Sequence, residues 1–415
     1  MLDPLILARG IHIAATVLAA GTVAFMVLVA PAAGAPGDFS ALRRRLTALV
    51  WVALAVAIMS GLAWLVCLAA DIYGAPIIEV CLNGGIWSVL TETRFGLIWI
   101  IRLALAVLLA ALMPWPATRL LQMAAVAGLI SLIALVGHAG ATPGVTGRIH
   151  LASDMVHLLA AGAWLGTLPA LALLLARARR ADNAAWGEYA VAVTRRFSLL
   201  GTISVIALLA SGIINSWNLL GGPRDLVTTG YGRLLLFKVG LFAVMLCIAA
   251  VNRFHLTPRL PAAGPLRALA RNSWAETALG LCVLLIVGAL GVMSPSGHAH
   301  ETNAQIPPDA AFVHIHTNEA MAEVTIEPGR AGQANAIIRV LREDFSEFPA
   351  KDVRLALEAP GTGDEIARSA AHLPDGIWQL NSITLSQPGV WTARVTIAPA
   401  TGPSIVLDAP IVIDR

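Results

Sequence analysis

Three ionisable residues lie close together in the apolar stretch "HLASDMVHLLAAGAW", which covers residues 150–164. In a helix, steps of about 100° per residue place His150, Asp154 and His157 on one face. Ionisable groups in a membrane-spanning helix are costly, and they usually face the interior of the bundle or a water-filled cavity. Imidazole nitrogens bind copper, zinc, iron and nickel. This face is therefore a candidate site for a transition metal.

Further polar residues lie at similar depths in other apolar stretches. Because a helix rises about 1.5 Å per residue, His12, Arg102 and His157 are expected about 10 Å below the outer ends of their helices. Lys238 is expected about 8 Å below the outer end of its helix. We therefore expect a polar cavity that opens outward in the outer half of the bundle. The metal ligands expected there are His12, His138, His150 and His157.

Other residues are expected to support these ligands. Asp154 could orient an imidazole, or it could pair with Arg102 or Lys238 from neighbouring helices. Arg102 and Lys238 cannot bind a metal while they are protonated, so they are expected to line the cavity or balance charge. Met155 adjoins the polar face and could add a soft ligand near the entrance. The alternative, that each histidine only forms hydrogen bonds between helices, stays open.

The elements that position these residues are membrane-spanning helices. The chain has 415 residues, of which 57% are hydrophobic and 13% are charged, whereas about a quarter of a soluble protein is charged. Apolar runs predict eight helices across a lipid bilayer. The first is expected to be retained rather than cleaved as a signal peptide, and no internal repeat is apparent. The predicted spans are residues 5–30, 47–70, 95–113, 118–139, 150–176, 198–220, 233–251 and 275–293.

Arginine residues predict the orientation of the bundle. They concentrate after the first, third, fifth and seventh spans, as in the "RRR" of residues 43–45. Because arginine-rich loops face the cytoplasm, both termini are expected on the outer, periplasmic side.

The composition changes at about Ser294, where the chain becomes polar and rich in Pro, Gly, Thr and Val. The stretches "AEVTIEP", "ANAIIRVL", "VRLALEAP" and "WTARVTIAP" alternate like strands and end at Pro or Gly. The predicted fold is thus an α-helical bundle followed by a small all-β, immunoglobulin-like sandwich. The expected domains are residues 1–293 and 311–415, joined by a linker at 294–310.

The C-terminal domain carries a second group of candidate metal ligands. In the stretch "FVHIHTNEAM", His314 and His316 are two positions apart, so in a strand they point to the same face. They could share one metal ion, with Met321 as a soft ligand. A merely exposed strand face is the alternative that stays open.

The sequence also excludes several functions. A net charge of +3 and the lack of a basic run interleaved with aromatics argue against nucleic-acid binding. No phosphate-binding G-x-x-x-x-G-K-[ST] motif occurs, so a transport step would use a gradient or capture of the ion rather than ATP. The four cysteines form no framework of disulfides, and whether Cys67 and Cys81 pair on the outer side stays open.

Four stretches of the chain resemble the copper resistance protein D (CopD) family over about residues 1–293. They are "LTETRFGLIWIIRL", "GHAG", "DMVHLLAAGAWLGTLPAL" and "YGRLLLFKVGLFAVMLCIAAVNRFHLTPRL". The C-terminal stretch "FVHIHTNEAMAEVTIEPGRAG" resembles the YtkA-like domain that is often fused to such membrane parts.

The resemblance implies a protein of the bacterial inner membrane that handles copper, as Cu(I) or Cu(II), and moves it from periplasm toward cytoplasm. It implies a carrier and not an enzyme, supplied by its own tail or by a soluble CopC-like chaperone. The positions of this sequence that it singles out are His138, His157, Trp164, Gly166, Arg102, Lys238, Asn252 and Arg253.

Two other functions stay open from the sequence. A b-type cytochrome would hold haem between histidines of facing helices, such as His12 with His138 or His157. A copper sensor or assembly factor that does not transport would use the C-terminal domain as its working part.

Overall fold

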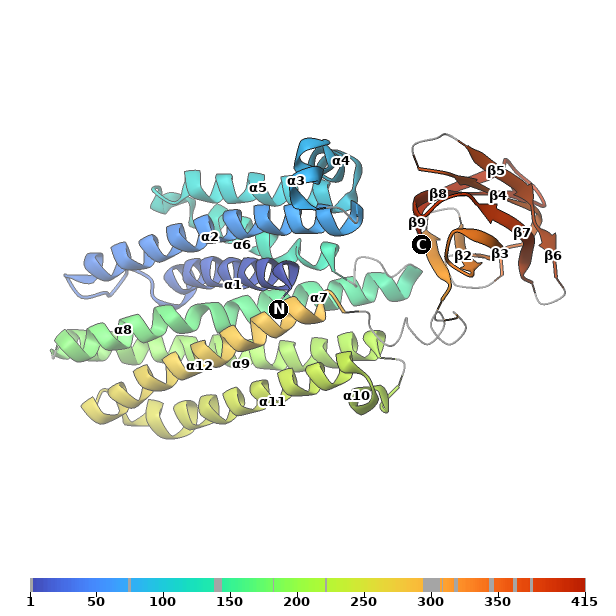
Figure 1. Ribbon diagram of the computed structural model, residues 1–415. Helices are drawn as coiled ribbons and strands as arrows, with labels where there is room; N and C mark the ends of the chain where they lie inside the picture. The colour runs from blue at the N-terminus through green and yellow to red at the C-terminus, as the bar shows by residue number, and fades with distance from the viewer. Residues whose placement is uncertain are drawn as a thin grey trace. The chain divides into compact units, whose positions relative to one another are not determined.

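The computed structural model describes residues 3–73, 76–137, 144–181, 183–220, 222–293, 307, 309–316, 320–342, 347–360, 364–373 and 376–414. The chain divides into two compact units, one helical and one formed by the C-terminal strands. Figure 1 shows the helices of the first unit running alongside one another, and the strands of the second unit forming a separate sandwich.

Within the described residues, eight helices are long and apolar enough to cross a membrane, as the sequence predicts. Several are built from more than one helical segment. In chain order their segments are α1 (Pro4–Ala24) with η1 (Phe25–Val29); α2 (Phe39–Tyr73); α5 (Arg94–Leu112); η2 (Pro116–Thr118), α6 (Arg119–Ser131) and η3 (Ala134–Val136); α7 (Gly144–Trp164), η5 (Leu165–Thr167) and α8 (Leu168–Ala181); α9 (Ala184–Leu219); α11 (Gly230–Val251), η6 (Asn252–Leu256) and η7 (Thr257–Arg259); and α12 (Ala263–Leu290).

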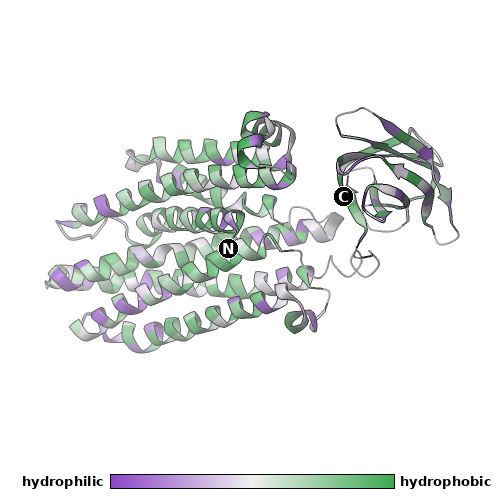
Figure 2. Cartoon of the chain, in the orientation of Figure 1, coloured by the Kyte–Doolittle hydropathy of each residue, from purple (hydrophilic) through white to green (hydrophobic). Residues whose placement is uncertain are grey.

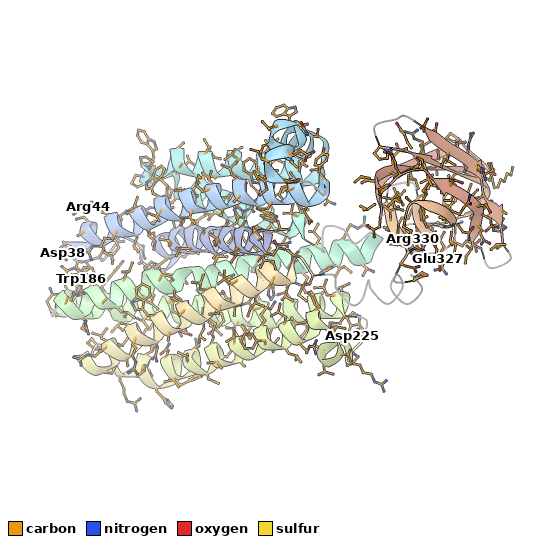
Figure 3. The ribbon with its side chains drawn as sticks, in the orientation of Figure 1. Asp38, Arg44, Trp186, Asp225, Glu327 and Arg330 are labelled. Carbon is orange, nitrogen blue, oxygen red and sulfur yellow. The ribbon has the colours of Figure 1, made fainter. Side chains whose placement is uncertain are left out.

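The helices extend beyond their apolar parts at the ends that carry the arginines. The second helix begins at Phe39 and the eighth at Ala263, earlier than their apolar runs indicate. These extensions contain arginines, so a search for apolar runs does not include them in the predicted spans. Arginine is nevertheless a good helix former, so the helix continues through them. Hydrophilic residues accordingly gather at the helix ends in Figure 2. Asp38, Arg44 and Trp186 lie at one end of the helical unit and Asp225 at the other (Figure 3).

Three short helices were not predicted from the sequence. They are α3 (Ile77–Leu82), α4 (Gly85–Glu92) and α10 (Asp225–Thr228). Their runs are too short to give a periodic apolar pattern. Two of them, α4 and α10, end directly before a membrane-spanning helix.

The fifth helix is interrupted at η5, a single tighter turn between α7 and α8. Pro169 follows this turn within α8. Proline has no N–H to donate, so the carbonyl of Leu165 loses its usual helical partner, and the local winding changes. The interruption lies one turn before Pro169, where the missing helical hydrogen bond would fall.

The first helix lies inside the helical unit, next to α2, α6, η5 and α12 (Figure 1). Its crossing with the fifth helix is a contact between two glycines. A Cβ atom on Gly21 would lie 2.0 Å from the carbonyl carbon of Gly166, and one on Gly166 would lie 2.1 Å from the carbonyl oxygen of Val17. Small residues allow such close backbone approach in membranes, which gives Gly166 a structural role.

The C-terminal unit is a β-sandwich of two antiparallel sheets, as predicted. One sheet has the order β1-β2-β3-β7-β6 and the other β5-β4-β8-β9. The strands are β1 (Ala311–His316), β2 (Met321–Glu327), β3 (Gly332–Leu341), β4 (Ala350–Glu358), β5 (Glu365–Ser369), β6 (Ala371–His372), β7 (Trp378–Leu385), β8 (Gly389–Pro399) and β9 (Ile405–Ile413).

The four predicted strand stretches correspond to β2, β3, β4 and β8. Alternate residues of these strands fill one core, in which Val324, Ile338, Val353 and Val395 are fully buried. A core of this kind gives the unit its own hydrophobic stabilisation.

The glycine crossing makes a prediction about stability. Gly166→Ala places a methyl group against backbone atoms of the first helix, which cannot move as a flexible side chain can. We expect it to destabilise the protein by about 1–3 kcal/mol, measured as a lower apparent melting temperature in detergent. Gly240→Ala is the matched control, because nothing lies within 4 Å of the added atom on α11. Equal melting of the two variants would contradict this packing.

Candidate functional site

His12 is buried between helices, with both ring nitrogens in hydrogen bonds. Its Nδ1 lies 2.8 Å from the carbonyl oxygen of Ala57 on α2. A carbonyl can only accept, so Nδ1 carries the proton and Nε2 carries the lone pair. That lone pair faces Arg102 on α5, whose Nη2 lies 2.6 Å from Nε2. Trp64 packs edge-on against the ring at 5.6 Å between centroids.

Arg102 joins the first, third and fourth helices. Besides His12, its guanidinium donates to the carbonyl oxygen of Leu129 on α6 and reaches the hydroxyl of Thr16 at 3.5 Å. A cavity of about 30 Å³ adjoins the His12–Arg102 pair, which is room for a water molecule. A metal ion would have to displace Arg102 to reach the lone pair of His12.

His157 has a different environment. Its Nδ1 lies 2.9 Å from the hydroxyl oxygen of Ser211 on α9. The Ser211 hydroxyl itself lies 2.6 Å from the carbonyl oxygen of Ala207, to which it donates. Ser211 therefore accepts from Nδ1–H, and Nε2 of His157 carries a lone pair. The backbone of Leu208 on α9 is a further hydrogen-bond partner of this ring. An imidazole that is protonated on Nδ1 and carries its lone pair on Nε2 is a form that binds metals.

Asp154 lies one turn before His157 and belongs to a group of polar residues from several helices. Asn215 on α9 donates to its carboxylate at 3.1 Å. Lys238 on α11 and Arg9 on α1 are its charged neighbours. Of the two partners expected from the sequence, the structure therefore brings Lys238 near Asp154, whereas Arg102 is bonded to His12.

The remaining candidates in the bundle have varied surroundings. His150 is 2% exposed and lies inside α7, because this helix begins six residues earlier than predicted. Met155 packs against the apolar cluster around the first and fourth helices. Trp164 is buried at the end of α7, edge-on to Phe242 at 5.8 Å. His138 lies outside the described residues.

No three His, Cys, Asp or Glu residues come together as a metal-binding group in the part of the chain that the structure describes. His12 and His157 have separate sets of partners, so their convergence on one ion stays a prediction. It depends on His138, whose position is not described.

Several residues of these polar groups were not identified from the sequence. Ser211 was missed because serine is common in helices and carries no charge. Arg9 lies over the Trp64 ring at 5.2 Å and donates to the carbonyl oxygen of Gly291. It was not identified because it lies near the end of a predicted span, where charged residues are common. Glu276 on α12 was missed for the same reason, although it is 1% exposed and accepts from Asn252 at 3.1 Å.

The C-terminal histidines lie on the first strand of the sandwich. His314 is exposed, and its Nδ1 lies 3.5 Å from a carboxylate oxygen of Glu323 on β2. The register pairs His316 directly with Met321, which is fully buried. Residues opposite each other in antiparallel strands share a face, so the register places Met321 on the face of positions 314 and 316. A shared metal site there stays a prediction. The side chain of His316 lies outside the described part of the structure.

Cys67 on α2 and Cys81 on α3, which the sequence leaves open as a pair, are both free thiols. The loop between the second and third helices is therefore held without a bond between them. Val80 and Val89 of α3 and α4 pack instead against Leu65 and Ala69 of α2.

Two known protein families together match most of the helical unit. The family described as "Copper resistance protein D" matches residues 191–290, and "Copper resistance protein D-like, N-terminal domain" matches residues 1–148.

Three known proteins are similar to the chain. "Inner membrane protein YebZ" of Escherichia coli (strain K12) is 40% identical over 51% of this chain and 72% of its own length. "Copper resistance protein D" of Pseudomonas syringae pv. tomato is 30% identical over 50% of this chain and 71% of its own. "Copper transport protein CutJ" of Bacillus subtilis (strain 168) is 30% identical over 75% of this chain and 57% of its own.

The polar group around Asp154 makes a prediction about energetic coupling. Asp154→Asn and Lys238→Met should each destabilise the protein, because each leaves a buried charge without its neighbour. The double variant should lose less than the sum, with a coupling of about 0.5–3 kcal/mol. Apparent melting temperatures of the three variants in detergent measure this coupling.

The matched control combines Asp154→Asn with Arg102→Gln. These two residues have separate partners, so their effects should add. Additivity of Asp154 with Lys238, or strong coupling of Asp154 with Arg102, would contradict the arrangement described.

Proposed function

Because the chain belongs to the copper resistance protein D family, we propose that it carries copper across the bacterial inner membrane, from periplasm toward cytoplasm. Copper is the transported substrate, taken as Cu(I) or Cu(II), and the protein acts as a carrier rather than as an enzyme. The arginine-rich helix ends face the cytoplasm in this proposal, and both termini are periplasmic.

One observation supports this proposal most strongly. Nε2 of His157 carries a lone pair inside the helical unit, and Ser211 fixes the ring through Nδ1. A metal-bound histidine normally donates its other ring N–H to an oxygen in this way, which orients the ring and strengthens its binding. The hydrogen bond with Ser211 thus orients the His157 ring as in a metal ligand, and no bound metal is needed to explain this orientation.

Other residues complete the proposed copper path. His150, two turns before His157 on the same face of α7, and His138 are the further imidazoles of the outer half. Met155 adjoins this face as a soft ligand near the entrance. His12 would join once Arg102 leaves its Nε2 atom. The polar group of Asp154, Asn215 and Lys238 lies beside His157, where the carboxylate and the ammonium offset each other's charge.

Delivery and release need further steps. We propose that copper arrives from the C-terminal sandwich, through His314, His316 and Met321, or from a soluble periplasmic chaperone of the CopC type. The interruption at η5 and Pro169 supports a bend of the fifth helix that opens the inner half of the bundle. A gradient or capture of the ion inside would drive the movement.

The first test concerns the ligand and the residue that orients it. Cells that carry His157→Ala should lose the copper accumulation that the wild-type protein confers. Ser211→Ala should weaken copper binding to the purified protein by about 10–100-fold, because the ring is no longer held.

Ser60→Ala is the control for the serine, since within the described ranges the Ser60 hydroxyl donates to carbonyls of its own helix and contacts no imidazole by a hydrogen bond. His255→Ala, an exposed residue near the inner end of the seventh helix, is the control for the histidine. Unchanged uptake in the His157 variant would count against this site. A Soret absorption band in the purified protein would favour the haem alternative instead.

The second test concerns the C-terminal histidines. The full chain with both His314→Ala and His316→Ala should bind one copper ion fewer at saturation, while the bundle keeps its own. Metal analysis after equilibrium dialysis measures this number. His372→Ala, on the opposite edge strand of the same sheet, is the control and should bind as much copper as the wild type. Equal copper content in all three proteins would exclude a copper site on this face.

A further inference from the structure

The first four and the last four membrane-spanning helices form two halves of the helical unit. Local features of the first three helices of one half recur in the first three of the other, although no repeat is apparent in the sequence. The third and seventh helices both begin at a threonine. Thr93 accepts from the N–H of Gly96 at 3.0 Å and donates to the carbonyl of Val89. Thr229 accepts from the N–H of Gly232 at 2.9 Å and donates to the carbonyl of Asp225. In each case a short helix, α4 or α10, ends immediately before.

The second and sixth helices correspond in the same way. Ser60 donates to the carbonyl four residues earlier at 2.6 Å, and Ser211 does the same at 2.6 Å. Each serine is followed by a glycine against which a histidine ring lies. A Cβ atom on Gly61 would be 3.0 Å from the ring of His12, and one on Gly212 would be 3.6 Å from the ring of His157.

The first and fifth helices meet at the centre of this arrangement. Gly21 follows His12 by nine positions, and Gly166 follows His157 by nine positions. These two glycines contact each other. His12 and His157 therefore occupy equivalent positions on the two sides of a helix crossing.

Each histidine also has a basic neighbour from the third helix of its own half. Arg102 follows Thr93 by nine positions, and Lys238 follows Thr229 by nine. Arg102 is the charged neighbour of His12, and Lys238 is that of His157. Both imidazoles carry the lone pair on Nε2, as their Nδ1 partners require.

We propose that the bundle holds two equivalent imidazole sites, of which the His157 site is open to copper and the His12 site is closed by Arg102. The difference is one side chain. The guanidinium of Arg102 donates to Nε2 of His12, whereas no hydrogen bond from Lys238 to His157 occurs among the described residues. Arginine presents several donors in a planar fork, while lysine is a compact charge at the end of a flexible chain.

This inference rests on the proposed function for the identity of the ion, but not for the difference between the sites. Arginine at position 238 should close the His157 site, and lysine at position 102 should open the His12 site. In Lys238→Arg, the longer side chain should reach Nε2 of His157 and weaken copper binding by about tenfold or more, the size expected for disturbing a ligand's surroundings. In Arg102→Lys, His12 should be released and a further copper ion should bind.

The experiment uses the full-length protein in detergent and two readouts. Diethyl pyrocarbonate, which modifies imidazole nitrogens that carry an available lone pair, is followed at each histidine by mass spectrometry. We expect His157 to react and His12 to be protected in the wild type. Lys238→Arg should protect His157, and Arg102→Lys should expose His12. Copper content of the same samples is measured in parallel.

Lys238→Gln is the control, because it removes the charge without adding a donor fork, so it should leave His157 reactive. If Lys238→Arg does not fold, the reactivity of His12 in Arg102→Lys decides the question alone. Reactivity of both histidines that is unchanged by the exchange would overturn the inference, even in a protein that binds copper. The expected reactivities in a protein that binds no copper would uphold the two sites and refute the proposed function.

Discussion

The hydrogen bond between Arg102 and His12 is the interaction on which the first half of the bundle depends. A guanidinium enclosed by membrane-spanning helices needs partners within the protein, because lipid offers none. Arg102 finds them on the first and fourth helices, at His12 and the carbonyl oxygen of Leu129. The same bonds that hold three helices together also occupy the lone pair of an imidazole. Stability and metal binding therefore compete at this position.

In the second half of the bundle, the basic side chain and the metal do not compete for the same imidazole nitrogen. Lys238 takes the place of Arg102, and the nearby carboxylate of Asp154, held by Asn215, supplies the opposite charge. Ser211 orients the imidazole of His157 from the other side, so Nε2 needs no partner from the protein to hold the ring. In the proposed mechanism His157 of this half is open to copper, while His12 of the first half joins only once Arg102 leaves its Nε2 atom. The glycine crossing of Gly21 and Gly166 packs the two halves together.

The number of membrane helices and the sandwich were predictable, because apolar runs and strand alternation leave clear patterns. The partners of the polar residues in the bundle were not. His12 bonds the backbone carbonyl of Ala57, and any residue type presents a carbonyl. Ser211 has no property that separates it from other helical serines. The correspondence between the two halves is not visible in the sequence, because it involves only a few positions. At one of them, arginine in the first half corresponds to lysine in the second.

X-ray absorption at the copper edge tests the central claim most directly. It is measured on the copper-loaded full-length protein in which His314 and His316 are both replaced by alanine, so that only the bundle contributes. The account predicts nitrogen ligation with the outer-shell scattering of imidazole rings. Copper coordinated by sulfur alone, or by light atoms without imidazole scattering, would contradict a histidine site in the outer half of the bundle.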